Sequence, residues 1–148
     1  MGRPGVTQRL LVLSPPEPKA AVILIAGGHG GLQIFSNGSF EWGDSNFLIR
    51  TRQLFVDQGL TVAILDAPSD RQSPPFLSGF RQTAEHTEDI KAVIAWLREQ
   101  AKVPVWLVGT SRGTQSAAYV AIALADSDGP DGLEREVVGQ TAAWILAK

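Results

Sequence analysis

Residues 103–124 read VPVWLVGTSRGTQSAAYVAIAL, and this stretch decides the fold. It begins with a short apolar run rich in β-branched residues, which is typical of a buried strand. It ends with an alanine-rich run, from Thr114 to Leu124, that holds neither glycine nor proline, as expected of a helix. Between the two runs lies a G-x-S-x-G pentapeptide at residues 109–113. The stretch therefore predicts a strand, a tight turn and a helix, with Ser111 at the turn.

The pentapeptide makes the Ser111 hydroxyl a candidate nucleophile. A serine on a tight strand-to-helix turn projects its hydroxyl from the edge of the sheet, and small flanking residues let the two backbones approach. Arg112 would begin the helix, so that its backbone N–H points toward a developing oxyanion. The alternative is a glycine-rich turn that carries an incidental serine.

The chain before this stretch alternates between apolar runs and helical periodicity. Strands are expected in three further segments, residues 6–13, 20–26 and 60–65. Helices are expected over residues 46–58, with Ser45 or Asp44 as the N-cap, and over residues 83–100. Such alternation predicts an α/β fold in which helices cover both faces of a mostly parallel sheet.

Each of these two helices has an apolar stripe that predicts its buried face. In the first helix the stripe consists of Phe47, Thr51, Leu54 and Phe55. In the second helix it consists of Ile90, Val93, Ile94 and Leu97. His86 lies near the start of the second helix, and we expect its side chain to be partly exposed.

Ligands of such sheets bind beyond the carboxyl ends of the strands, where residues 27–31, residues 66–80 and the Ser111 turn would meet. The first of these loops reads GGHGG and has two interpretations. A nucleotide-binding protein would use it for phosphate, but Gln33 stands where the dinucleotide fingerprint requires its third glycine. We favour the second interpretation, in which backbone N–H groups of the loop complete an oxyanion hole, over a plain glycine turn.

The order of these elements, together with the turn at Ser111, resembles the α/β-hydrolase fold over residues 6–128. The resemblance implies a serine hydrolase that acts on a small-molecule ester or a related acyl substrate. By the same resemblance, Ser111 is the nucleophile and the backbone N–H of Arg112 is one oxyanion donor.

The second oxyanion donor maps by this resemblance onto the loop after the strand at residues 20–26. Alignment by the end of that strand selects the backbone N–H groups of Gly28 or His29. Alignment by the His-Gly-Gly string selects Gly30 or Gly31 instead. We favour Gly28 and His29.

The chain departs from the family because no histidine follows Ser111, although the family's triad runs Ser, acid, His. A turn-like bridge and an amphipathic run at residues 133–147 follow the helix after Ser111, and this run resembles the family's terminal helix. We therefore interpret residues 1–148 as one domain with a truncated α/β-hydrolase fold. In this interpretation the segment that carries the acid and the histidine is missing near residues 129–133.

A serine without a positioned base is a poor nucleophile, so we expect weak activity or none. His29 is the one histidine whose loop faces the turn, and Asp66, at a strand end, could line the pocket. The alternative to an enzyme is a catalytically inactive hydrolase-fold protein that serves in binding or as a scaffold. Without the later strands of the fold, the strand from Val103 to Val108 becomes an exposed edge that invites self-association.

The composition limits the partners that the chain can have. A formal net charge of −2, with 44% hydrophobic and 19% charged residues, is typical of a soluble globular domain and gives no electrostatic case for nucleic acid. Cysteine is absent and the 2 histidines lie far apart in the sequence, so we expect neither a metal nor a cofactor. We also expect no signal peptide and no membrane-spanning segment.

Overall fold

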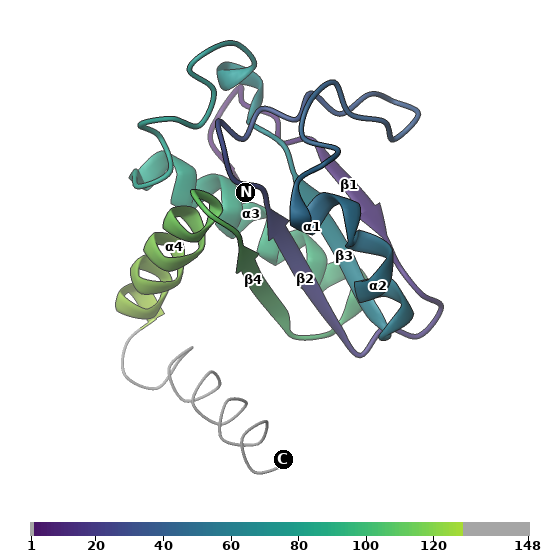
Figure 1. The fold of residues 1–148 in the computed structure, drawn as a ribbon. Helices are drawn as coiled ribbons and strands as arrows, with labels where there is room; N and C mark the ends of the chain where they lie inside the picture. Colours follow the sequence, from purple (N-terminus) through teal and green to yellow (C-terminus); the bar gives the residue numbers. More distant parts are fainter. Residues whose placement is uncertain (1, 129–148) are drawn as a thin grey trace.

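The computed structural model describes residues 2–128, and the elements along them alternate as expected (Figure 1). In chain order they are β1 (Leu10–Leu13), β2 (Ala20–Ile25), α1 (Phe47–Arg50), α2 (Arg52–Asp57), β3 (Leu60–Leu65), the short 3-10 helix η1 (Ser69–Arg71), α3 (Ala84–Ala101), β4 (Val105–Gly109) and α4 (Gly113–Asp128). The amphipathic run at residues 133–147 and the junction near residues 129–133 lie outside the described residues.

The strands form one sheet in the order β1-β3-β2-β4. β2 runs parallel to both β3 and β4, while β1 pairs antiparallel with β3. The prediction of a mostly parallel sheet is confirmed, although β1 begins at Leu10 rather than at residue 6. β4 lies at the opposite edge, where its second side meets no strand within residues 2–128.

Helices cover both faces of the sheet, with α1 and α2 in front of it and α3 behind it in Figure 1. The side chains of β2 alternate between the two faces. Ile23 packs in the same cluster as Ile90 of α3, whereas Leu24 packs in a second cluster with Ile49 of α1. A strand that is buried on both faces needs apolar residues throughout, which is why β2 is a continuous apolar run and β3 departs from one only at Thr61.

The expected helix at residues 46–58 is interrupted, and of its predicted apolar stripe Phe55 packs against the core whereas Phe47 and Leu54 are exposed. Asn46, rather than Ser45 or Asp44, is the N-cap of α1, and its side chain accepts a hydrogen bond from the N–H of Leu48. α1 ends at Arg50, and the hydroxyl of its C-cap residue Thr51 donates to the carbonyl of Phe47 at 2.6 Å. A side-chain bond of this kind competes with the helix backbone and bends it. Leu48 and Ile49 are consequently buried, while Phe47 and Leu54 of the predicted stripe are 54% and 62% exposed.

The loops that follow β2, β3 and β4 gather at the top of Figure 1, beyond the carboxyl ends of the parallel strands. The three loops that the sequence singled out therefore share one edge of the sheet. Among residues 2–128, the structure contains no helix with both the length and the apolar character that crossing a membrane requires.

Candidate functional site

The turn at Ser111 joins the end of β4 to the start of α4. Ser111 is exposed and has a φ of 51°, in the left-handed region that only glycine adopts without cost. The turn is tight, because the N–H of Gly113 donates to the carbonyl of Thr110 at 2.8 Å. A side chain held in this conformation costs about 1–2 kcal/mol, and strain of this kind is concentrated at functional sites.

The glycines of the pentapeptide are required by the close approach of three backbones. A Cβ atom on Gly109 would lie closer than 3.0 Å to the carbonyl oxygen of Gly113, and one on Gly113 would lie as close to the carbonyl oxygen of Ile25. A Cβ atom on Gly27 would lie 2.9 Å from the Cβ atom of Ser111. The loop after β2 is therefore pressed against the Ser111 turn.

Backbone donors are available beside this turn. Within the described residues, the N–H groups of Gly28, His29 and Arg112 donate to no protein acceptor. The alternative alignment had selected Gly30 or Gly31, but the N–H of Gly31 donates to Nδ1 of His29 at 3.0 Å. That bond occupies the N–H of Gly31, but within the described residues the N–H of Gly30 also donates to no protein acceptor, so these bonds do not separate Gly30 from Gly28 and His29.

His29 lies in a stack of aromatic rings rather than in contact with Ser111. Its ring centroid is 3.9 Å from that of Trp42 and 4.5 Å from that of Phe76. Burial, followed by the positive charge of Arg81, lowers the pKa of His29 and favours the neutral ring. Because Nδ1 accepts the N–H of Gly31, the proton of the neutral ring is on Nε2, which then donates rather than accepts. His29 in this state is not a base for Ser111.

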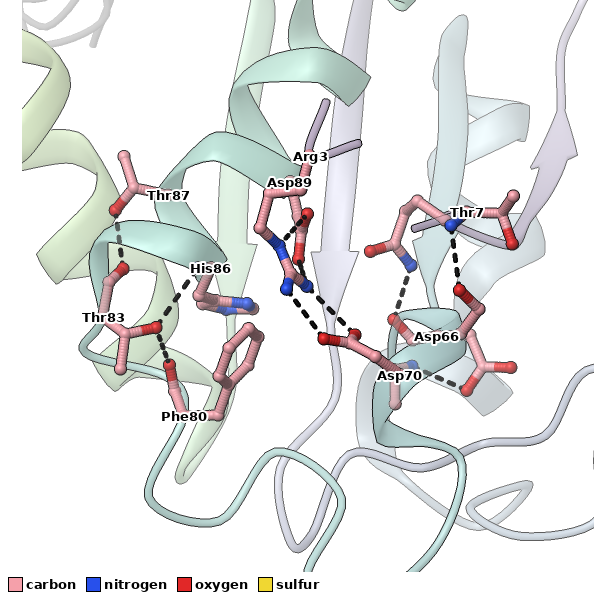
Figure 2. A network of polar contacts seen from close by, with 12 residues as sticks. Arg3, Thr7, Asp66, Asp70, Phe80, Thr83, His86, Thr87 and Asp89 are labelled. Carbon is pink, nitrogen blue, oxygen red and sulfur yellow. Dashed lines mark hydrogen bonds and ion pairs between the residues drawn. The ribbon is translucent and has the colours of Figure 1, made fainter. Parts of the chain in front are cut away.

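The other histidine contradicts the expectation of partial exposure, because His86 is 1% exposed. Its Nε2 lies 2.9 Å from the hydroxyl oxygen of Ser116, and its ring meets the ring of Phe80 edge-on (Figure 2). Burial is the main cause that lowers the pKa of His86 to about 4, with the positive charges of Arg81 and Arg3 adding to it. The sequence carried a signal for this position, since residue 86 continues the 86, 90, 93, 97 stripe of α3.

A polar network beside His86 ties the N-terminus to α3. Figure 2 shows Arg3 between two carboxylates, and its guanidinium donates to Asp89 at 2.7 and 2.9 Å and to Asp70 at 2.7 and 3.0 Å. These bonds raise the pKa of Arg3, and the same contact lowers the pKa of Asp70. The guanidinium of Arg3 also lies 5.3 Å from the centroid of the Phe80 ring, which in turn packs against His86.

Asp66 does not line a pocket, because its side chain is completely buried. Its carboxylate accepts hydrogen bonds from the backbone N–H groups of Leu32, Gln33 and Ile34 at 3.0–3.1 Å, and from that of Ala67 at 2.7 Å. Each charge-assisted bond of this type is stronger than a neutral one. Asp66 therefore anchors the loop after β2 and has no free oxygen with which to serve as a base.

Arg81, which no pattern in the sequence marks as a functional residue, is 3% exposed. Its guanidinium donates to the carbonyls of Ala26 and Gly28 at 3.0 and 3.1 Å and to the hydroxyl of Ser116 at 3.0 Å. Burial, followed by the charge of Arg112, lowers the pKa of Arg81 to about 10, so it stays protonated at neutral pH. A single arginine in a loop gives no periodic signal, and only the packed fold brings it against the glycine loop.

The glycine loop is not followed directly by a helix, since α1 begins only at Phe47. A phosphate site of the dinucleotide type needs a helix N-terminus at that place, so this arrangement argues against it. Within residues 2–128, His, Asp and Glu side chains form no group of three that could hold a metal ion.

No protein-family model and no curated protein matches the chain. Among solved structures, DcsB in complex with its substrate analogue is similar over 78% of this chain, at 17% identity and a TM-score of 0.51. A cold-adapted esterase from an Arctic intertidal metagenomic library is similar over 82% of this chain in its PEG-bound form (20% identity, TM-score 0.49) and over 83% in its native form (16%, 0.48). The matches cover 41% of the DcsB chain and 56–57% of the esterase chain, so this chain spans about half of their length. The fold is α/β-hydrolase-like.

Proposed function

We propose that Ser111 is the nucleophile of a serine hydrolase site that accepts small-molecule esters or related acyl compounds. One observation carries the proposal: Ser111 is held at a φ of 51° on an exposed turn, and Gly109 and Gly113 on either side of it leave no room for a Cβ atom. A turn that served only to connect β4 with α4 would have no need for a strained serine at its tip, because glycine fits there without cost. The strain is explained if the hydroxyl has to project toward a substrate.

The chemistry proposed for this site is acyl transfer. The Oγ atom of Ser111 attacks the carbonyl carbon of the ester, and the carbonyl oxygen becomes an oxyanion that accepts hydrogen bonds from the N–H groups of Arg112 and of Gly28 or His29. The carbon–oxygen bond of the ester then breaks and the alcohol leaves with the proton that the Ser111 hydroxyl gives up. Water hydrolyses the acyl-serine to a carboxylic acid and restores the Ser111 hydroxyl. One oxyanion donor contributes about 10²–10³ in rate.

Neither histidine of the described chain is placed to accept the hydroxyl proton of Ser111. His86 is engaged with Ser116, and His29 has its accepting nitrogen occupied by Gly31. Loss of a triad member leaves about 10³–10⁴-fold catalysis over water from the oxyanion hole and binding. We therefore propose that this chain reacts with strongly electrophilic acyl or phosphonyl groups but turns over ordinary esters slowly.

The same observation supports a second candidate, a catalytically inactive protein that uses the hydrolase-like fold for binding. In that case the oxyanion donors and the aromatic wall of His29, Trp42 and Phe76 would hold a carboxylate or an acyl group without reaction. Trp42 is 38% exposed, and a Cβ atom on Gly28 would touch its ring, so this wall borders the proposed donors.

The experiment that separates the candidates is covalent labelling with a fluorophosphonate probe, read by mass spectrometry of the modified peptide. We expect the wild-type chain to be labelled on Ser111, the S111A variant to remain unlabelled, and the S73A variant, changed at an exposed loop serine, to be labelled as wild type. Hydrolysis of p-nitrophenyl acetate gives the turnover rate. If the wild-type chain is not labelled, Ser111 is not a nucleophile, and the second candidate, a binding protein without catalytic activity, is retained.

A further inference from the structure

We infer that Arg81 is the positioning residue that sets the oxyanion loop against Ser111. This inference rests on the proposed function. The guanidinium of Arg81 contacts both halves of the proposed site, since it bonds to Ala26 and Gly28 in the loop after β2 and to Ser116 in the helix that follows Ser111. A Cβ atom on Gly30 would lie 2.7 Å from Nη2 of Arg81, so the loop is packed directly on the guanidinium.

The bond to Gly28 determines where the next N–H points. In a trans peptide the carbonyl of one residue and the N–H of the following residue point in opposite directions. Because the carbonyl of Gly28 points into the protein toward Arg81, the N–H of His29 faces the other side of the loop. That N–H has no protein acceptor among residues 2–128, and Gly27, two residues earlier, meets Ser111.

The charge of Arg81 adds to its geometric role. The hydrogen bonds of Arg81 in the described chain all go to neutral oxygens, and neither of the ion pairs found there includes it. A buried cation without a carboxylate is expensive. The donor on the Gly28 carbonyl polarises the peptide that follows it and strengthens the N–H of His29 as a hydrogen-bond donor.

Alternative roles for Arg81 are less consistent with these contacts. Arg3, which ties the N-terminus to α3, pairs with the carboxylates of Asp70 and Asp89. Arg81 is instead bound to the two carbonyls that flank Gly27 and to a serine one turn into α4. These contacts fix the spacing between the loop and the Ser111 turn.

The test compares R81Q and R81K with the wild-type chain and with R98Q, in which an exposed arginine of α3 is changed. For fluorophosphonate labelling we expect the maximal rate constant to fall about 10²-fold in R81Q, with half-saturation unchanged, and R81K to recover part of it. In the S116A variant, which removes only the hydrogen bond between Arg81 and Ser116, the maximal rate constant should fall less than in R81Q. R98Q should label as wild type.

A second readout does not depend on reactivity. In ¹⁵N-labelled protein, the amide resonance and hydrogen exchange of His29 should change in R81Q and stay near wild type in R98Q. If wild-type Ser111 is not labelled, the proposed function fails, and this readout alone decides whether Arg81 holds the peptide. An unchanged His29 amide in R81Q, or in R81K and S116A if R81Q does not fold, would overturn the inference. So would wild-type labelling of folded R81Q.

Discussion

Replacement of His86 by glutamine should remove most of the acid sensitivity of this fold. His86 is 1% exposed and its pKa is about 4 in the folded chain, against 6.5 for an unperturbed histidine. Between these two values the unfolded chain binds a proton at this position and the folded chain does not. The free energy of unfolding therefore rises with pH in this window, and it falls as the pH is lowered from about 6.5 to about 4.

The size of the effect follows from the difference between the two pKa values. Each pKa unit corresponds to about 1.4 kcal/mol, so His86 accounts for about 3 kcal/mol of stability that is present at pH 7 and lost by pH 4. The free energy of unfolding of a domain of this size is about 5–15 kcal/mol, so the loss at His86 is a large share of the total stability. The positive charges that face the ring, Arg81 and Arg3, act in the same direction as burial.

The assay is urea denaturation followed by tryptophan fluorescence at several pH values from 7.5 to about 4. We expect the wild-type chain to lose stability steeply through this range and H86Q to show a much smaller slope. His29, whose pKa is also lowered, supplies part of the remaining slope. S116A is the control, since it removes the hydrogen-bond partner but leaves a buried imidazole, and it should be less stable at pH 7 while it keeps the slope. A wild-type slope in H86Q would refute the argument.

Three further predictions concern the turn, the loop anchor and the sheet edge. G113A should lower the free energy of unfolding by about 1–3 kcal/mol or more, because its Cβ atom would meet the carbonyl oxygen of Ile25. G2A is the control and should be neutral. Equal midpoints of urea unfolding for the two variants would contradict this prediction. D66N should cost about 2–3 kcal/mol by the same measurement, since a neutral amide replaces the acceptor of four backbone N–H groups. The edge of β4, which meets no strand within residues 2–128, should cause concentration-dependent self-association in light scattering, and W106K, at a 37% exposed position of that strand, should reduce it. A monomer at all concentrations would reject the edge contact.

Periodicity in the sequence was a reliable guide where an element is buried along its whole length. β3 has the predicted bounds, β2 is one residue shorter, and α3 buries Ile90, Val93 and Leu97 as expected. Periodicity did not predict the break between α1 and α2. There the hydroxyl of Thr51 bonds to a backbone carbonyl of α1, and the apolar residues on the two sides of the break no longer form one stripe. The pattern of apolar residues cannot indicate such a break, because the competing bond is made by a residue that also fits the stripe.

By itself, the sequence determined the order of strands and helices, the glycines around Ser111 and the absence of a later histidine, because each of these is a property of neighbouring residues. The tertiary structure alone decided the partners of the buried polar groups. Asp66 binds a loop more than thirty residues earlier, and His86 and Arg81 meet at Ser116, at least thirty residues later. Such contacts depend on how helices and loops pack on the sheet. The buried Ser–His contact of this fold therefore lies at Ser116, in the first turn of α4, and not at Ser111, the serine that the motif identified.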